Sequence, residues 1–251
     1  KALVMSVSFM GIASLSMSLL PTYEAIGIVS CYLIVLIRLI QGLSVGGEFS
    51  GAIIYAMEHF NKKKAGLVGG IVVGGCIIGV LLAMIVSKIV QNPLLPEYSW
   101  RFAFLVGFGL SIIGYFVRSR LLETPEFLSS LKDKAKIPIL VGIKNHPKEC
   151  LGTVVIAAAN GINFYFILFF LPSYINKILD ISVSFFPILT MITAIVLSPL
   201  LSALSDKIGR GRMLTYGLLG TSVWGYIGLQ LVMIYPSTEM AIVFFLVHAV
   251  I

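Results

Sequence analysis

The chain has 251 residues, of which 58% are hydrophobic and 12% are charged. Soluble domains carry about 25% charged residues, so this composition excludes an ordinary soluble enzyme or binding domain and indicates an all-α polytopic membrane protein. The net charge of +7 does not indicate a nucleic-acid partner, because the basic residues lie in short segments between apolar runs and so encode membrane orientation.

Apolar runs of membrane-spanning length follow one another along the chain. The spans that we expect cover residues 2–20, 25–58, 66–90, 101–117, 150–171, 181–204 and 213–234. A shorter apolar run begins at Pro236 and stops at Ile251, so we interpret the chain as a segment of a longer protein. Pro172 is expected to lie in the loop between the fifth and sixth spans.

One long polar stretch, from Ser119 to His146, separates the first four spans from the rest. Within it, Thr124 and Pro125 are typical of the first residues of a surface helix. This stretch is the predicted boundary between two halves of the chain.

The Lys and Arg residues at the ends of the spans predict the orientation. Those on one side are Lys1, Lys62, Lys63, Lys64, Arg118, Arg120, Lys132, Lys134, Lys136, Lys144, Lys148, Lys207, Arg210 and Arg212. Those on the other side are Lys88, Arg101 and Lys177. The first, richer side is therefore predicted to be cytoplasmic.

Arg38 lies in the middle of the second span. At a helical rise of about 1.5 Å per residue it is roughly 16 Å from the start of the span, near the membrane midplane. The residues that share its helix face are Gln41, Val45, Glu48, Ala52 and Tyr55. A guanidinium at this depth must face the protein interior and find a partner, and this depth argues against a snorkelling side chain. The expected spans contain no carboxylate at the same depth, so the counter-charge is expected from another span, a bound anion or water.

Small residues in the second and third spans predict close helix packing. The glycines concerned are Gly42, Gly46, Gly47, Gly51, Gly70 and Gly74. Glycines spaced four apart let a second helix approach the backbone in a membrane.

Polar side chains in the fifth span are candidates for a solute cavity. Asn160 and Asn163 share a helix face, whereas Tyr165 is turned away from Asn160. Such side chains either line a cavity or bond neighbouring helices, and the sequence leaves both possibilities open. Gln41 is the corresponding candidate in the second span.

A charged turn, Ser205–Arg212, follows the sixth span. In it, Asp206 can cap the next helix, Gly209 permits a tight turn, and Arg210 and Arg212 can reach carboxylates. The alternative is a solvated loop that only sets topology. No metal or cofactor is expected, because the cysteines and histidines have no ligand spacing.

These segments together are similar to a known family. The run of residues 38–58 resembles the fourth helix of the major facilitator superfamily, in particular its metabolite:proton symporter branch and, within it, proline/betaine transporters. Residues 205–212 are similar to the second copy of its loop motif, and residues 98–101 and 122–127 resemble the two ends of its sixth helix. The resemblance covers the chain as helices three to ten of twelve.

The resemblance implies the major facilitator fold, present in part, and a domain division. Residues 1–118 would be the remainder of the N-terminal helical bundle, residues 119–147 the central cytoplasmic loop, and residues 148–251 the start of the C-terminal bundle. It also implies that Arg38 takes part in proton coupling. Glu58, with Asp206, Gly209, Arg210 and Arg212, would form the cytoplasmic gate.

Our leading hypothesis is a secondary transporter for a small polar organic solute. It would import a proline/betaine-type osmolyte or an organic acid with protons, by alternating access, as a monomer in the inner membrane of a bacterium. An alternative is a non-transporting, truncated remnant of such a transporter. An intramembrane enzyme is the alternative of another class, but it would need titratable or metal-binding residues converging at one depth.

Overall fold

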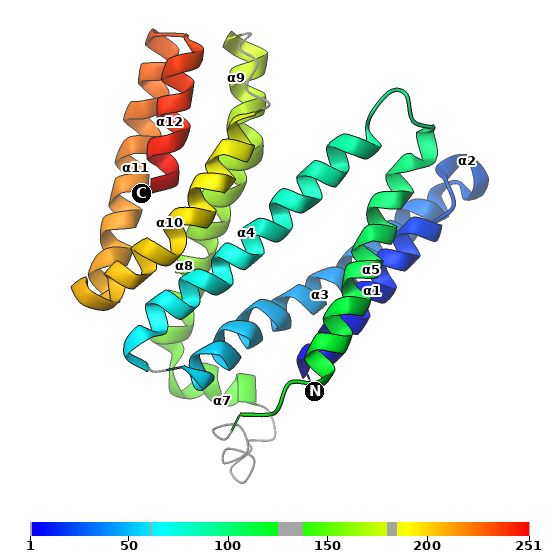
Figure 1. The fold of residues 1–251 in the computed structure, drawn as a ribbon, viewed down its shortest axis with the longest axis horizontal. Helices are drawn as coiled ribbons and strands as arrows, with labels where there is room; N and C mark the ends of the chain where they lie inside the picture. Colours follow the sequence, from blue (N-terminus) through cyan, green and yellow to red (C-terminus); the bar gives the residue numbers. More distant parts are fainter. Residues whose placement is uncertain (1, 61, 125–137, 180–184, 251) are drawn as a thin grey trace. The chain divides into compact units, whose positions relative to one another are not determined.

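The structure is a computed structural model that describes residues 2–60, 62–124, 138–179 and 185–250. The described residues form helices joined by short turns (Figure 1). Backbone contacts divide the chain into two compact units, Lys1–Thr124 and Pro125–Ile251. This division lies inside the 119–147 segment, whereas the predicted bundle boundaries themselves stay predictions.

The described residues of the first unit form four long helices and three short ones. They are α1 (Ala2–Leu19), α2 (Tyr23–Ile26), α3 (Ile28–His59), η1 (Lys62–Lys64), α4 (Ala65–Val90), η2 (Glu97–Ser99) and α5 (Trp100–Ser119). α1 packs along α5 and against α3, as the dark blue and green ribbons of Figure 1 show. The second span was predicted as one helix from Ala25, but Gly27 interrupts it with a φ of 58°, a conformation open mainly to glycine.

The contact between α1 and α5 is built on small residues. A Cβ added at Gly11 would lie 2.9 Å from the Cβ of Ser111, and one added at Gly107 would lie 3.6 Å from the Oγ of Ser14. In membranes such residues let helix backbones approach closely. A core cluster of buried apolar side chains connects α1 to α3, and Ile37 is its member on α3.

The second unit contains the remaining helices. They are α7 (Pro138–Asn145), α8 (Pro147–Tyr165), η4 (Phe166–Phe170), α9 (Leu171–Leu179), α10 (Phe186–Ile208), α11 (Arg210–Ile234) and α12 (Thr238–Val250). α12 packs against both α10 and α11. Its side chains Phe244 and Phe245 are almost fully buried, and Phe245 contacts Phe186 of α10 with ring centroids 5.3 Å apart.

Pro172 lies inside a helix, so the prediction that it belongs to a loop is wrong. α8, the π-helical segment η4 and α9 follow one another without a break. Proline has no N–H to bond the carbonyl four residues earlier, and its ring crowds that carbonyl. The wider turn of a π-helix just before Pro172 accommodates both effects. One membrane-length helical run therefore extends from Pro147 to Lys177.

Within the described residues, 6 helical runs are long and apolar enough to cross a membrane. The sequence predicted seven spans and a shorter eighth, and the difference lies in the first, because α1 is slightly too short to be counted. α12 corresponds to the short eighth run. The predicted surface helix from Pro125 and the predicted start of the sixth span at Ile181 lie outside the described residues.

Candidate functional site

Arg38 projects from the middle of α3 and its side chain is exposed. Its Nη1 donates a hydrogen bond to the Oε1 of Gln41, at 3.1 Å, one turn further along the same helix. Among the described residues no carboxylate pairs with Arg38. Two of the predicted site residues therefore lie together, and the guanidinium keeps donors that Gln41 does not use.

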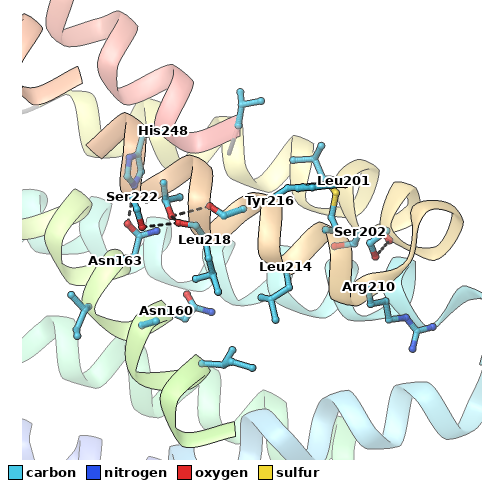
Figure 2. Close-up of a pocket in the computed structure, with 18 of the residues that line it drawn as sticks. Asn160, Asn163, Leu201, Ser202, Arg210, Leu214, Tyr216, Leu218, Ser222 and His248 are labelled. Atoms are coloured by element: carbon cyan, nitrogen blue, oxygen red, sulfur yellow. Dashed lines mark hydrogen bonds between the residues drawn. The ribbon is translucent and has the colours of Figure 1, made fainter. Parts of the chain in front are cut away.

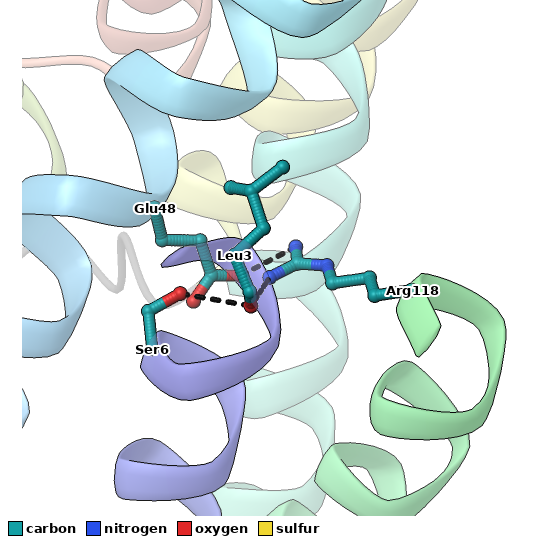
Figure 3. A network of polar contacts seen from close by, with 4 residues as sticks. All are labelled: Leu3, Ser6, Glu48 and Arg118. Atoms are coloured by element: carbon teal, nitrogen blue, oxygen red, sulfur yellow. Dashed lines mark hydrogen bonds and ion pairs between the residues drawn. The ribbon is translucent and has the colours of Figure 1, made fainter. Parts of the chain in front are cut away.

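Glu48, further along the same face of α3, has a cationic partner that the sequence did not reveal. Arg118, in the last turn of α5, donates from Nη2 to the Oε1 of Glu48 at 2.7 Å and from Nη1 to the carbonyl of Leu3 at 3.3 Å. Figure 3 shows the guanidinium between Glu48 and Leu3, whose carbonyl also accepts the hydroxyl of Ser6. One side chain thus connects α1, α3 and α5.

Glu58 lies at the other end of α3 and contacts the segment that follows α5. The hydroxyl of Thr124 donates to the Oε2 of Glu58, and the hydroxyl of Tyr55 donates to the carbonyl of Leu122 at 3.1 Å. Thr124 is only 2% exposed. These contacts hold residues 122–124 against the end of α3, and the gate function of Glu58 stays a prediction.

The turn between α10 and α11 consists of one residue, Gly209, with a φ of 108°. Asp206 lies in the last turn of α10 and accepts from the guanidinium of Arg210 at 3.0 Å. The residue at the N-cap of α11 is Gly209, and capping of this helix by Asp206 stays a prediction. Arg212 is exposed.

A cavity of about 1010 Å³ lies within the second unit, between α8, α10, α11 and the end of α12. Asn160 and Asn163 both line it, and Tyr165 does not (Figure 2). Tyr165 is 66% exposed and packs against Phe169 with ring centroids 5.6 Å apart. Asn160 and Asn163, which share a helix face, therefore line the cavity, whereas Tyr165, the third candidate in this span, does not.

The hydroxyl groups around this cavity bond mostly to their own helices. Thr221 and Ser222 donate to backbone carbonyls of α11 one turn earlier, and Ser205 donates to Ser202 of α10. The side chain of Asn160 makes no hydrogen bond to a described residue, so its amide group is available to a ligand. Among the described lining residues, Arg210 is the one with a permanent charge.

His248 is a cavity residue that the sequence did not single out. Its Nε2 lies 2.9 Å from the Oδ1 of Asn163, and its ring stacks on Phe244 with centroids 5.9 Å apart. The two partners are far apart in the sequence, and a lone histidine in an apolar run has no local signal. The two side chains meet only in the folded unit, where His248 of α12 reaches Asn163 of α8 (Figure 2).

The predicted packing glycines fall into two groups. A Cβ added at Gly42, Gly46 or Gly47 would meet no atom within 4 Å, whereas one added at Gly51 would lie 3.0 Å from the Cδ2 of Leu3. Gly70 and Gly74 of α4 are buried. Close helix contact at Gly42, Gly46 and Gly47 stays a prediction.

The described part of the chain contains no group of three or more His, Cys, Asp or Glu side chains that could hold a metal ion. Its membrane-length helices form two units, and together they define a multi-pass helical membrane protein. The family model of the Major Facilitator Superfamily matches residues 1–251, and the chain belongs to that superfamily.

Several curated relatives are similar over most of this chain. The proline/betaine transporter of Salmonella typhimurium is 29% identical over 235 residues, which are 86% of this chain and 47% of the relative. A putative metabolite transport protein of Haemophilus influenzae is 33% identical over 242 residues, 88% of this chain and 54% of the relative. The glycine betaine/proline/ectoine/pipecolic acid transporter of Dickeya dadantii is 28% identical over 235 residues, with coverages of 86% and 47%.

The chain thus spans about half the length of these relatives. No solved structure is significantly similar to it.

Proposed function

We propose that the protein is a secondary transporter that imports a small polar organic solute together with protons. The solute would be a proline/betaine-type osmolyte or an organic acid, and the protein would work as a monomer in the cytoplasmic membrane of a bacterium. The observation that carries the proposal is the cavity in the second unit, with the unbonded amide of Asn160 and the side chain of Asn163 in its wall. The names of the relatives support the choice of solute.

The chemistry of the cavity suits a solute with a carboxylate. The described wall offers amide donors at Asn160 and Asn163, and none of its described lining residues is acidic. The guanidinium of Arg210, also in the wall, is paired with Asp206. An amide can donate to a carboxylate. A zwitterion such as proline or betaine, or an organic acid, presents this group.

In the proposal, Arg38 couples proton movement to the transport cycle. Its guanidinium has no carboxylate partner among the described residues, so it can respond to a carboxylate that gains and loses a proton elsewhere in the protein. Gln41 fixes the side chain by its hydrogen bond at 3.1 Å. Loss of the positive charge should therefore uncouple accumulation from the proton gradient while leaving solute binding intact.

Alternating access requires contacts that stabilise one state more than the other. We propose that Glu58 and the turn with Asp206, Gly209, Arg210 and Arg212 supply them at the cytoplasmic side. The turn carries the ion pair between Asp206 and Arg210, and in this proposal its charges exchange partners between the two states. Contacts made in only one state would provide the differential stability that a transport cycle needs.

The test is uptake of radiolabelled proline and glycine betaine by the protein in liposomes under an imposed pH gradient. We expect accumulation by the wild type, at least tenfold less accumulation by Arg38→Ala, and retained exchange of internal for external solute in that variant. Gln41→Ala keeps the charge and should lower accumulation much less. Undiminished accumulation by Arg38→Ala would remove the coupling role, and a wild type that transports none of the solutes would refute the proposed function.

A further inference from the structure

His248 is buried in the second unit with one ring nitrogen unbonded. The residue is 6% exposed, and its Nε2 lies 2.9 Å from the Oδ1 of Asn163. Its Nδ1 is buried and has no hydrogen-bond partner in the described part of the chain. Buried polar atoms are nearly always paired, so an orphan of this kind needs an explanation.

A second histidine in the chain shows the bond that His248 lacks. The Nδ1 of His59 lies 2.9 Å from the carbonyl of Tyr55, four residues earlier on α3. The residue four before His248 is Phe244, and its carbonyl accepts the indole N–H of Trp224 at 3.1 Å. The α-helical pattern also pairs that carbonyl with the backbone N–H of His248, so both of its lone pairs are used.

The unbonded nitrogen determines the protonation state of the ring. A bond to the Oδ1 of Asn163 requires a proton on Nε2. A second proton, on Nδ1, would bury both an N–H without an acceptor and a positive charge without a counter-charge. From this geometry we infer a neutral ring, protonated on Nε2 and bare at Nδ1.

No charged side chain compensates His248 from the elements around it. The charged residues of α12 itself, and of the described helices α8, α10 and α11 that contribute to its surroundings, are Glu239, Lys148, Glu149, Asp206, Lys207, Arg210 and Arg212. His248 makes no ion pair or hydrogen bond with any of them. Arg210, and the titratable hydroxyl of Tyr216, lie in the wall of the same cavity. Among these described helices no carboxylate bonds to the ring, so a solute that enters the cavity could supply the negative charge that stabilises its protonated form.

We propose that His248 is a proton-binding residue whose protonation requires a solute carboxylate in the cavity of the second unit. The carboxylate would bind to the amide groups of Asn160 and Asn163, and its charge would stabilise a proton added to Nδ1 of His248. Binding of the proton and of the carboxylate then favour each other to the same extent, as linkage demands. This inference rests on the proposed function and adds to it a proton site distinct from the carboxylate that is proposed to act with Arg38.

The first experiment measures the ring directly, by nitrogen NMR of the protein labelled with ¹⁵N-histidine. His248→Gln, which keeps a donor for Asn163, identifies the signal. Without solute we expect a neutral ring protonated on Nε2. With glycine betaine at about pH 6, near the midpoint of an ordinary histidine, we expect the doubly protonated ring. Choline has the same quaternary ammonium but no carboxylate, and it should leave the ring neutral. A proton on Nδ1 without solute, or a ring still neutral with saturating glycine betaine, would overturn the proposal.

The second experiment measures protons taken up from a weakly buffered solution when glycine betaine binds. We expect uptake by the wild type and by His146→Gln, which changes an exposed histidine, and little or none by His248→Gln. Equal uptake by His248→Gln would overturn the proposal.

Trp224→Phe is a variant that should raise the proton affinity of His248. It keeps an aromatic ring against Phe244 but removes the indole N–H, which frees a lone pair of the Phe244 carbonyl for a protonated Nδ1. We expect the NMR titration of His248 to move about one pH unit higher, about a tenfold change in proton affinity. An unchanged or lower midpoint would contradict the role given to Nδ1. This titration needs no solute. It therefore tests the role of Nδ1 in the protonation of His248 even if the wild type transports none of the solutes and the proposed function fails.

Discussion

The two units use their polar side chains in different ways. In the first unit, two arginines of α5 bond to other helices: Arg101 donates to the carbonyls of Ser18 and Leu20, and Arg118 donates to Leu3 and Glu48. In the second unit, the polar groups around the cavity include two amides, an imidazole, several hydroxyls and the guanidinium of Arg210, and one nitrogen of His248 has no partner among the described residues.

This difference separates groups that hold helices from groups that can bind. The arginines of α5 have their donors occupied by carbonyls at the ends of α1 and by a carboxylate, so they contribute stability. The side chains of Asn160 and His248 retain unbonded atoms, which is typical of a site that is completed by a ligand. Substitutions in the first set should change stability first, and those in the second set should change binding first.

Arg118→Ala should have the largest effect on stability. It leaves Glu48 without its cation and the α1 contact without its donor, at a cost of about 2–3 kcal/mol, because a bond to a charged group is worth more than a neutral one. Thermal unfolding of the purified protein measures it. The double variant with Glu48→Gln should recover part of the loss, and full additivity would show that the two side chains do not interact.

Gly11→Leu should come next, because it tests the close contact of α1 with α5. Any side chain at this position meets Ser111, whose Cβ would be 2.9 Å from the added Cβ, and overpacking of this kind costs about 1–3 kcal/mol. Unfolding temperature is again the measurement. Ser111→Gly combined with Gly11→Leu should restore much of the lost stability. Gly69→Leu is the control, because a Cβ added there meets nothing within 4 Å, and it should lower the unfolding temperature less than Gly11→Leu does. An equal loss at Gly69 would mean that helix propensity, not contact, decides the effect.

The helices could be predicted from the sequence because each apolar run is long enough to form one by itself. What failed was a local detail: Pro172 was interpreted as part of a loop, but a π-helical segment before it accommodates the proline. Nothing in the residues Phe166–Phe170 distinguishes a π-turn from an α-turn. The break at Gly27 was missed because a glycine does not reveal its φ before the chain is folded.

The candidate site could be predicted only where its members lie on one helix. Asn160 and Asn163 are one turn apart, and so are Arg38 and Gln41, so helical periodicity was enough to group them. Arg118 and Glu48 are separated by 70 residues, and His248 and Asn163 by 85. Such pairs depend on helix packing, which composition and periodicity do not specify.

Gly209→Ala tests a residue that neither joins helices through its side chain nor offers atoms to a ligand. Its role is conformational. With a φ of 108°, an added Cβ is strained even though no atom lies nearby, and the expected cost is about 1–2 kcal/mol. Gly211→Ala, in the first turn of α11, is the matched control, and it should be neutral or slightly stabilising. Equal unfolding temperatures for the two variants would show that the turn can relax.

Arg210→Gln should have the smallest effect on stability. It distinguishes an arginine that only joins α10 to α11 from one that changes partners during transport. The side chain of Arg210 is 54% exposed and that of Asp206 10%, and a partly exposed pair contributes about 0.2–1 kcal/mol. If the pair only joins α10 to α11, uptake should fall no more than stability does. If Arg210 exchanges partners during transport, as we propose, uptake of glycine betaine should fall at least fivefold while the unfolding temperature stays within about 1–2 °C of the wild type. Lys207→Gln, which removes a neighbouring charge from the same turn, controls for the loss of positive charge at this surface. If uptake falls equally in both variants, the cause is the loss of surface charge, and Arg210 then serves to join α10 to α11 and not to gate transport.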